Sequence, residues 1–250
     1  MIGDDVSITN LHWHFSLREL RQQFGLTHCV ALNDFEALAL GLASLEESEK
    51  LLVKEGRATE SSPFVVLGPG TGLGVAAGVP GGDRLAVVSS EGGHRDLAAT
   101  DEEEWRIVEQ LRERFGHVSA ERVLSGPGLE NLYATLAPAS TNSEPVPSAE
   151  EVSRLSRDGD PRARRATELF SGWLGAFAGD LALTFGARGG VYLAGGALEG
   201  LGTAFDERHF VNRFLAKGRL RSYLEPIPVW RIVRSDAALL GCARALLALA

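Results

Sequence analysis

The sequence Gly68-Pro69-Gly70-Thr71-Gly72-Leu73-Gly74 decides the fold, because it joins two short apolar runs at residues 64–67 and 75–79. Two β-type runs around a glycine-rich turn predict a strand, a loop and a second strand. Glycine has no Cβ, so the backbone N–H groups of such a loop can approach an anion closely. The loop is therefore either a tight hairpin turn or a phosphate cradle, and its spacing alone favours neither. It does not follow the G-x-x-x-x-G-K-[ST] pattern and does not open a helix.

Composition narrows the class of protein. The 250 residues suit one large domain or two small ones, with enough apolar residues for a core. A net charge of −8 argues against a nucleic-acid-binding surface, and we see no apolar run long enough to span a membrane. The two cysteines stand in apolar stretches, which argues against a disulfide framework or a cysteine-based zinc site. We therefore expect a protein of the reducing cytoplasm.

Two polar residues follow the predicted strand at residues 29–32. Residues 29–32 read as a short buried strand that ends in Asn33-Asp34, and an apolar helix is expected from Phe35 to Leu45. A more polar helix is expected to follow, to about Glu55. Open α/β sheets bind ligands at such a strand–helix junction. Asn and Asp are also preferred helix caps, and capping is the simpler explanation of these two residues taken alone.

Two further strand ends hold residues that could contact a ligand. A predicted strand at residues 84–88 runs into Glu91-Gly92-Gly93-His94, whose two glycines allow the carboxylate and the imidazole to share one space. Such a pair suits a polyhydroxylated ligand, and a surface turn is the alternative. A later strand at 190–194 ends in Gly195-Gly196, which is either a second place where backbone could approach a ligand or a plain strand–helix turn.

Capping residues and glycines predict where several further helices begin and end. Ser16 opens a helix that Gly25 ends, and Asp160-Pro161 opens the longest one, which ends at Gly186. Ser119 caps a short helix, so the carboxylate of Glu121 would lie in a first turn that stabilises it in any case. The apolar helix expected at residues 236–249 should be buried against another element.

Several phrases together resemble bacterial glucokinases in order and rough spacing, over essentially all 250 residues. They are Asn33-Asp34-Phe35, Gly70-Thr71-Gly72-Leu73-Gly74, Glu91-Gly92-Gly93-His94, residues 117–128 and Leu193-Ala194-Gly195-Gly196. The phrase at 117–128 is the most specific of them. The cysteine cluster of the family's zinc-bearing relatives is missing, which disfavours that branch.

The resemblance implies an α/β protein with the two-domain actin-like ATPase (ribonuclease H-like) fold, and ATP-dependent phosphorylation of glucose at its 6-hydroxyl. Asp34 then corresponds to the general base, and Asn33, Glu91, His94 and Glu121 correspond to residues that hold the sugar hydroxyls. Gly70, Thr71, Gly72 and Gly74 correspond to the second phosphate-binding segment, and Gly195 and Gly196 to the segment near the adenosine. ATP and Mg²⁺ are the implied cofactors. Phosphoryl transfer depends mainly on positioning and charge neutralisation, which agrees with this set of residues.

One motif of the family is missing. The family begins with an Asp-x-Gly-Gly-Thr-Asn turn, its first phosphate-binding segment, and no such motif occurs in this sequence. We therefore expect a truncated small domain, formed by residues 1–44 and 235–250, beside a large α/β domain at 45–234. Exposed strand edges, an exposed apolar helix face and instability, aggregation or a homodimer would follow. The alternative function is a catalytically inactive sugar-binding fragment or regulatory binding module.

Overall fold

The chain folds around a six-stranded mixed sheet, and the computed structural model describes residues 4–8, 13–82, 84–137 and 145–249. The strands are β3 (Lys50–Lys54), β4 (Phe64–Pro69), β5 (Leu73–Gly81), β6 (Arg84–Ser90), β7 (Val191–Leu193) and β8 (Val229–Ile232). They lie in the order β3-β8-β7-β4-β5-β6. Neighbours β4, β7 and β8 pair in parallel, and the other neighbours pair antiparallel. The predicted α/β class and the predicted hairpin at the glycine-rich stretch are both confirmed.

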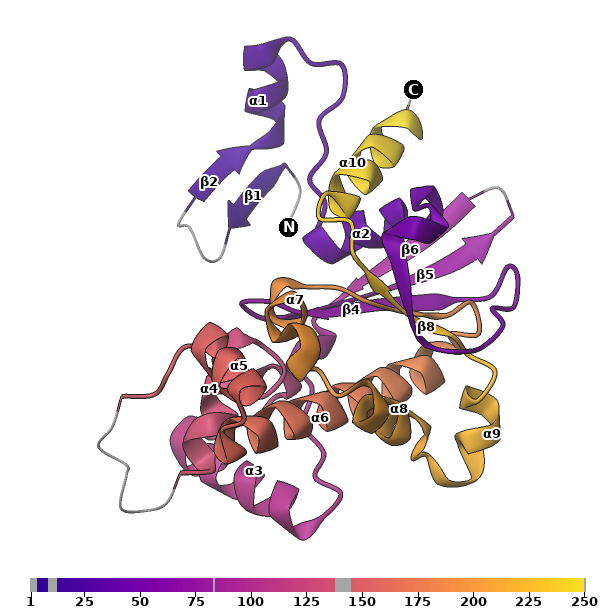
Figure 1. Cartoon of the computed structure of the whole chain (residues 1–250). Helices are drawn as coiled ribbons and strands as arrows, with labels where there is room; N and C mark the ends of the chain where they lie inside the picture. The colour runs from indigo at the N-terminus through magenta and orange to yellow at the C-terminus, as the bar shows by residue number, and fades with distance from the viewer. Residues whose placement is uncertain (1–3, 9–12, 83, 138–144, 250) are drawn as a thin grey trace.

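Helices cover both faces of this sheet (Figure 1). Their bounds are α1 (Leu17–Phe24), α2 (Asp34–Gly41), α3 (Glu102–Phe115), α4 (Gly126–Thr135), α5 (Ala149–Asp158), α6 (Pro161–Phe185), α7 (Gly196–Leu201), α8 (Glu207–Leu215), α9 (Arg221–Leu224) and α10 (Ala237–Leu247). Figure 1 shows α6 and α8 on one side of the sheet and α2 and α10 on the other. The expected starts at Ser16 and Asp160 and the expected ends at Gly25 and Gly186 are confirmed.

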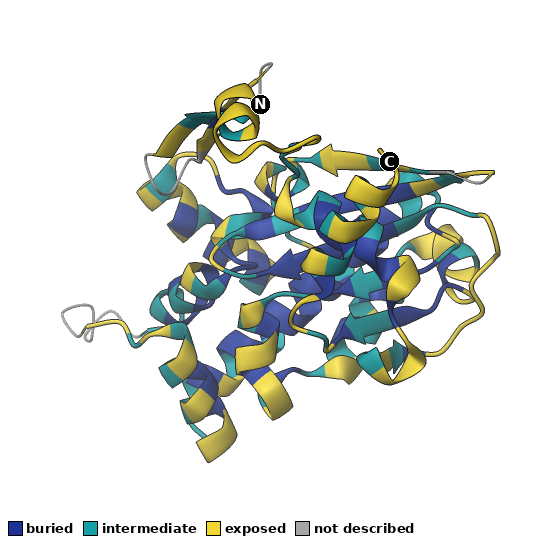
Figure 2. Ribbon diagram, turned by 90° about the horizontal axis from the view of Figure 1, so that it is seen from above, coloured by how far each residue is buried: buried dark blue, intermediate teal, exposed yellow. Residues whose placement is uncertain are grey.

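The two faces of the sheet carry separate hydrophobic clusters, because successive strand residues point to opposite sides. On β4, Val65 and Leu67 join the large cluster that contains α6, whereas Val66 joins the smaller cluster that contains α2 and α10. Figure 2 shows the buried segments gathered in the middle of the molecule and the exposed ones around them. Residues 64–69 are thus held from both sides, so the loop that follows them starts from a rigid strand.

Helices α2 and α10 cross at two glycines. A Cβ at Gly41 would lie 2.3 Å from the carbonyl oxygen of Ala237, and one at Gly241 would lie 1.6 Å from that of Ala37. Such distances exclude any side chain, so the two helix backbones are in direct contact here. The second half of α2 is in this way supported by a helix from the other end of the chain.

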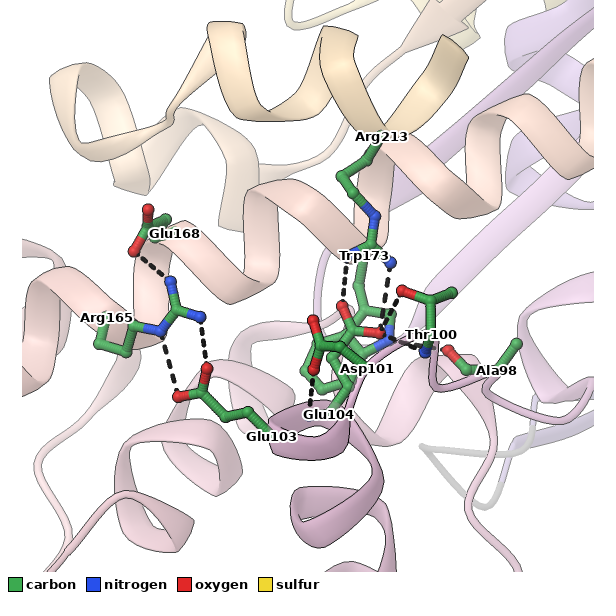
Figure 3. A network of polar contacts seen from close by, with 9 residues as sticks. All are labelled: Ala98, Thr100, Asp101, Glu103, Glu104, Arg165, Glu168, Trp173 and Arg213. Atoms are coloured by element: carbon green, nitrogen blue, oxygen red, sulfur yellow. Dashed lines mark hydrogen bonds and ion pairs between the residues drawn. The ribbon is translucent and has the colours of Figure 1, made fainter. Parts of the chain in front are cut away.

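A polar network anchors the segment that follows His94 (Figure 3). The Trp173 Nε1–H of α6 donates to the Ala98 carbonyl oxygen at 3.0 Å. Glu104 in the first turn of α3 is 2 % exposed, and its carboxylate pairs with Arg213 of α8 at 2.5 Å. The other carboxylate oxygen accepts from the backbone N–H and the hydroxyl of Thr100, at 2.7 and 3.0 Å. The chain between His94 and α3 is therefore fixed on the long helix and its neighbours.

Two predicted elements are wrong. Residues 29–32, expected as a buried strand, form no regular secondary structure, and Val30 is exposed. The polar helix expected before Glu55 is instead the short 3₁₀ turn η2 (Glu47–Glu49) followed by β3, which pairs with β8. That pairing is long-range, and it overrides the local helix preference of the segment. The Lys54 ammonium strengthens it by donating to three backbone carbonyl oxygens at 2.7–2.9 Å.

Apolar side chains stay exposed at the edge formed by the first and last elements. β1 (Asp5–Ile8) and β2 (Trp13–Ser16) form a separate two-stranded sheet, and none of the side chains of α1 is buried. In α10 only Ala237 and Gly241 are buried, while Leu239 and Leu247 are 68 % and 76 % exposed. The expected burial of this helix thus holds for one face only. Within the part of the chain that the structure describes, no helix is long and apolar enough to cross a bilayer.

Candidate functional site

The glycine loop between β4 and β5 is three residues long, Gly70-Thr71-Gly72, and Gly70 N–H donates to the Gly72 carbonyl oxygen at 2.8 Å. Gly70, Gly72 and Gly74 all have φ outside the left-handed region, so backbone strain requires none of them, and close packing requires only Gly72 and Gly74. A Cβ at Gly72 would lie 2.5 Å from Glu121 Oε2, and one at Gly74 would lie 1.9 Å from the ring of Phe35. A Cβ at Gly70 would meet nothing within 4 Å, so this residue faces open space.

Three of the predicted sugar-binding side chains meet beside this loop. His94 ends the 3₁₀ turn η3 (Gly92–His94), and its Nε2 lies 3.8 Å from Glu91 Oε2. Its Nδ1 lies 3.9 Å from Oε1 of Glu121, which belongs to the 3₁₀ turn η4 (Ala120–Arg122). Both separations exceed hydrogen-bonding distance. The imidazole and two carboxylates are close enough to share one ligand and keep capacity to bind it.

A close contact sets the η3 turn against β5. A Cβ at Gly93 would lie 2.1 Å from the Leu73 carbonyl oxygen, so only glycine allows η3 to reach the end of the hairpin. The two glycines between Glu91 and His94 therefore serve packing as well as the flexibility inferred from the sequence.

Asn33 and Asp34 begin α2, and both are exposed. Asn33 is the N-cap, as the capping alternative expects, because its side-chain oxygen accepts from the N–H groups of Phe35 and Glu36. Asp34 Oδ1 accepts from Phe35 N–H at 2.9 Å. In the described residues no hydrogen bond or ion pair joins Asp34 to Glu91, His94 or Glu121.

The ring of Phe35 links α2 to the glycine loop. It fills the space that a Cβ would need at Gly74, and its Cζ lies 2.9 Å from the Cβ position of Gly68. Phe35 thus places the start of α2, with Asp34, over the β4–β5 hairpin. In the sequence, Phe35 was notable only as part of the phrase Asn33-Asp34-Phe35. The packing role of its ring depends on glycines more than thirty residues later in the chain.

Gly195 and Gly196 follow β7, which pairs with β4 along the edge away from β5. Gly195 has φ +101°, and a Cβ there would lie 2.3 Å from the Pro69 carbonyl oxygen. Ala194 N–H donates to the Leu67 carbonyl oxygen at 3.0 Å. Gly196 is exposed with nothing near its Cβ position, so its backbone can be approached. The two predicted glycine segments are therefore neighbours, joined through β4.

The start of α4 also holds the loop, which sequence reasoning missed. Gly126 N–H donates to the Gly70 carbonyl oxygen at 2.8 Å, and Ser125 Oγ donates to the Glu121 carbonyl oxygen at 2.8 Å. The sequence feature that could have indicated these contacts is the long phrase at 117–128, which contains Glu121, Ser125 and Gly126. In the described ranges, no three His, Cys, Asp or Glu side chains are grouped so as to hold a metal ion.

Sequence and structure comparisons identify relatives of this chain. The sequence profile of the family described as Glucokinase matches residues 1–249. A glucokinase of Nitrobacter hamburgensis is 43% identical over 242 residues, which cover 96% of this chain and 76% of that protein. One of Aromatoleum aromaticum is 44% identical over 245 residues, which cover 98% and 74%. The crystal structure of a glucokinase from an Antarctic psychrotroph matches with a TM-score of 0.90 and 36% identity, over 99% of this chain and 77% of that one. The fold is thus that of the actin-like ATPase superfold, and the chain belongs to the glucokinase family.

Proposed function

We propose that the chain carries the sugar site and part of the donor site of an ATP-dependent glucose kinase, which transfers the γ-phosphoryl group to the 6-hydroxyl of glucose. One observation carries this proposal: Glu91, His94 and Glu121 meet beside a glycine loop over which Phe35 places Asp34. Membership of the glucokinase family supports the choice of glucose and ATP.

The sugar-binding roles follow from donor and acceptor capacity. Two carboxylates accept hydrogen bonds from hydroxyl groups, and a histidine ring can donate and accept. We assign Glu91, His94 and Glu121 to the hydroxyls of the sugar, together with the amide of Asn33. A site built to satisfy hydroxyls rejects analogues that lack them, because its polar groups are then left unpaired.

Asp34 is assigned as the general base. It is exposed at the start of α2 and its carboxylate makes no ion pair in the described residues, so an incoming hydroxyl can reach it. In this role it takes the proton of the 6-hydroxyl as that oxygen attacks the γ-phosphorus of ATP. The leaving β-phosphate oxygen keeps the electron pair of the broken P–O bond. A positioned base contributes about 10²–10⁴-fold in rate.

The donor would lie along the two glycine segments. Gly70 and Gly196 have no atom within 4 Å of their Cβ positions, so phosphate oxygens can approach both backbones. We assign Gly70, Thr71, Gly72 and Gly74 to the phosphates and Gly195 and Gly196 to the region of the adenosine. Mg²⁺ would accompany ATP; the described residues contain no group of three or more His, Cys, Asp or Glu side chains that could hold it, and none of the steps above depends on the metal.

We also propose a division of the chain into two domains. Residues 1–44 and 235–250 would form the small domain and 45–234 the large one. The direct contact of α2 with α10 supports grouping these two helices.

The test is ADP release by the purified chain with Mg-ATP and glucose, comparing Asp34→Asn with Glu36→Gln. Both residues lie on α2, and among the described residues the Glu36 carboxylate accepts one hydrogen bond, from the Ser89 hydroxyl at 3.0 Å. We expect Asp34→Asn to lower kcat by about 10²–10⁴-fold, as removal of a general base does, and Glu36→Gln to keep the wild-type rate. Equal rates for all three proteins would reject Asp34 as the base.

The alternative is a sugar-binding module without kinase activity. It keeps the same sugar residues but makes no use of Asp34. A chain that releases no ADP while glucose still raises its melting temperature would favour this alternative.

A further inference from the structure

We propose that Glu121 has a second role, as a positioning residue that couples sugar binding to the position of the phosphate loop. The inference rests on the proposed function, because it assigns a sugar-facing role to the same carboxylate. It goes further in stating that the two substrates affect each other's binding through one side chain.

The two oxygens of the Glu121 carboxylate face different partners. Oε2 accepts from the backbone N–H of Leu73 at 2.9 Å, at the point where the loop enters β5. Oε1 lies 3.9 Å from Nδ1 of His94, on the side of the proposed sugar site. The side chain is only 28 % exposed, so water competes weakly for it. A carboxylate that accepts from a backbone N–H forms one of the stronger hydrogen bonds in proteins.

The segment that carries Glu121 holds the loop at its other end as well. Gly126 N–H donates to the carbonyl oxygen of Gly70, and Ser125 Oγ ties the start of α4 to the backbone of Glu121. The loop of three residues is thus held at both ends by residues 121–126. A movement of Glu121 toward a sugar hydroxyl would therefore be transmitted to both ends of the loop.

The direction of the coupling follows from linkage. If a bound sugar fixes Oε1, Glu121 loses rotational freedom and Oε2 stays on Leu73 N–H, so the donor meets an ordered loop. The donor then tightens sugar binding by the same factor by which the sugar tightens donor binding.

The structure offers a variant that breaks the contact from the loop side. A Cβ at Gly72 would lie 2.5 Å from Glu121 Oε2 and meet no backbone, so Gly72→Ala displaces the end of a flexible side chain. Gly70→Ala is the matched control for this contact, since its Cβ meets nothing within 4 Å. Glu121→Gln is a second variant, because its amide oxygen can still accept from Leu73.

The first readout is hydrogen exchange of the Leu73 amide in the chain without ligands. We expect exchange to speed up about tenfold or more in Gly72→Ala and Glu121→Ala, as loss of a charged hydrogen bond implies, and less in Glu121→Gln. In Gly70→Ala the Leu73 amide should exchange at the wild-type rate. Unchanged Leu73 exchange in both Gly72→Ala and Glu121→Ala would overturn the proposal.

The second readout is the glucose dissociation constant, measured by calorimetry with and without Mg-ADP, at a concentration that a separate ADP titration shows to saturate each protein, because Gly72 is itself assigned to the phosphates. We expect ADP to tighten glucose binding to the wild type and to leave that of Gly72→Ala unchanged. A wild-type chain that binds glucose with the same affinity under both conditions, or a Gly72→Ala variant that keeps the full effect of ADP, would overturn the coupling alone. A wild-type chain that does not bind glucose would instead reject the proposed function, and the coupling with it.

Discussion

Replacing Arg213 by methionine should destabilise the protein strongly, because it removes the partner of a buried carboxylate. The Glu104 side chain is 2 % exposed and that of Arg213 15 %. Loss of one partner of a buried ion pair costs about 3–5 kcal/mol, since the remaining charge stays buried without compensation. Glu104 keeps its two hydrogen bonds from Thr100, so we expect the lower end, about 3 kcal/mol. For a chain of this size that corresponds to a fall in Tm of roughly 6–12 °C.

The assay is urea unfolding followed by far-UV circular dichroism, with Arg165→Met as the matched control. Arg165 pairs with Glu103 and Glu168, but its side chain is 36 % exposed and those of its partners are 43 % and 41 % exposed (Figure 3). Such pairs contribute about 1 kcal/mol or less. Adding Glu104→Gln to Arg213→Met should recover part of the loss, because the uncompensated charge disappears. The reasoning is refuted if Arg213→Met and Arg165→Met cost the same.

Three further outcomes are expected. Gly241→Ala should cost about 1–3 kcal/mol in the same urea assay, because its Cβ would overlap α2, whereas Gly200→Ala, with open space at its Cβ, should be nearly neutral. The Arg234 guanidinium holds the pKa of Asp236 below its ordinary 3.8, so this pair stabilises the fold above pH 3.8 and the stabilisation is lost as pH falls through the lowered pKa. The Tm difference between wild type and Arg234→Gln should therefore shrink in that acid range. A Tm difference that stays constant with pH would contradict this expectation. Burial raises the pKa of Tyr192 to about 12, so an absorbance titration at alkaline pH should show one tyrosine ionising later than the others, and Tyr192→Phe should remove that late step.

Local chemistry predicted those parts of the fold that neighbouring residues determine. The hairpin around Gly70, the cap at Ser16 and the helix from Asp160 each follow from a few adjacent residues, and the structure confirms them. Residues 50–54 failed for the opposite reason. Their strand forms because β8 lies beside them, and a local pattern carries no information about that partner.

The same distinction applies to the candidate site. The pairing of a carboxylate with His94 through two glycines could be inferred from spacing, and the structure brings these groups together with Glu121. The packing reason for the glycines at 68 and 74 is not local. Gly74 is required by the ring of Phe35, and Gly68 by the Ala194 carbonyl oxygen as well as by that ring, both from segments more than thirty residues away along the chain. Contacts of this kind depend on tertiary packing and appear only once the helices are placed on the sheet.

The pairing of β3 with β8 has a consequence for the order of events during synthesis. The Lys54 ammonium donates to the carbonyl oxygen of Ile227, which the ribosome adds 173 residues later. Strands β4, β5 and β6 are consecutive and can pair early, whereas β3 must wait for almost the whole chain. Contacts between distant residues form slowly, because a long loop must close first. During that interval the backbone N–H and C=O groups of β3 would have no strand partner and could pair with chaperones or with other unfinished chains, so we expect the yield of folded protein to be sensitive to how fast translation is completed.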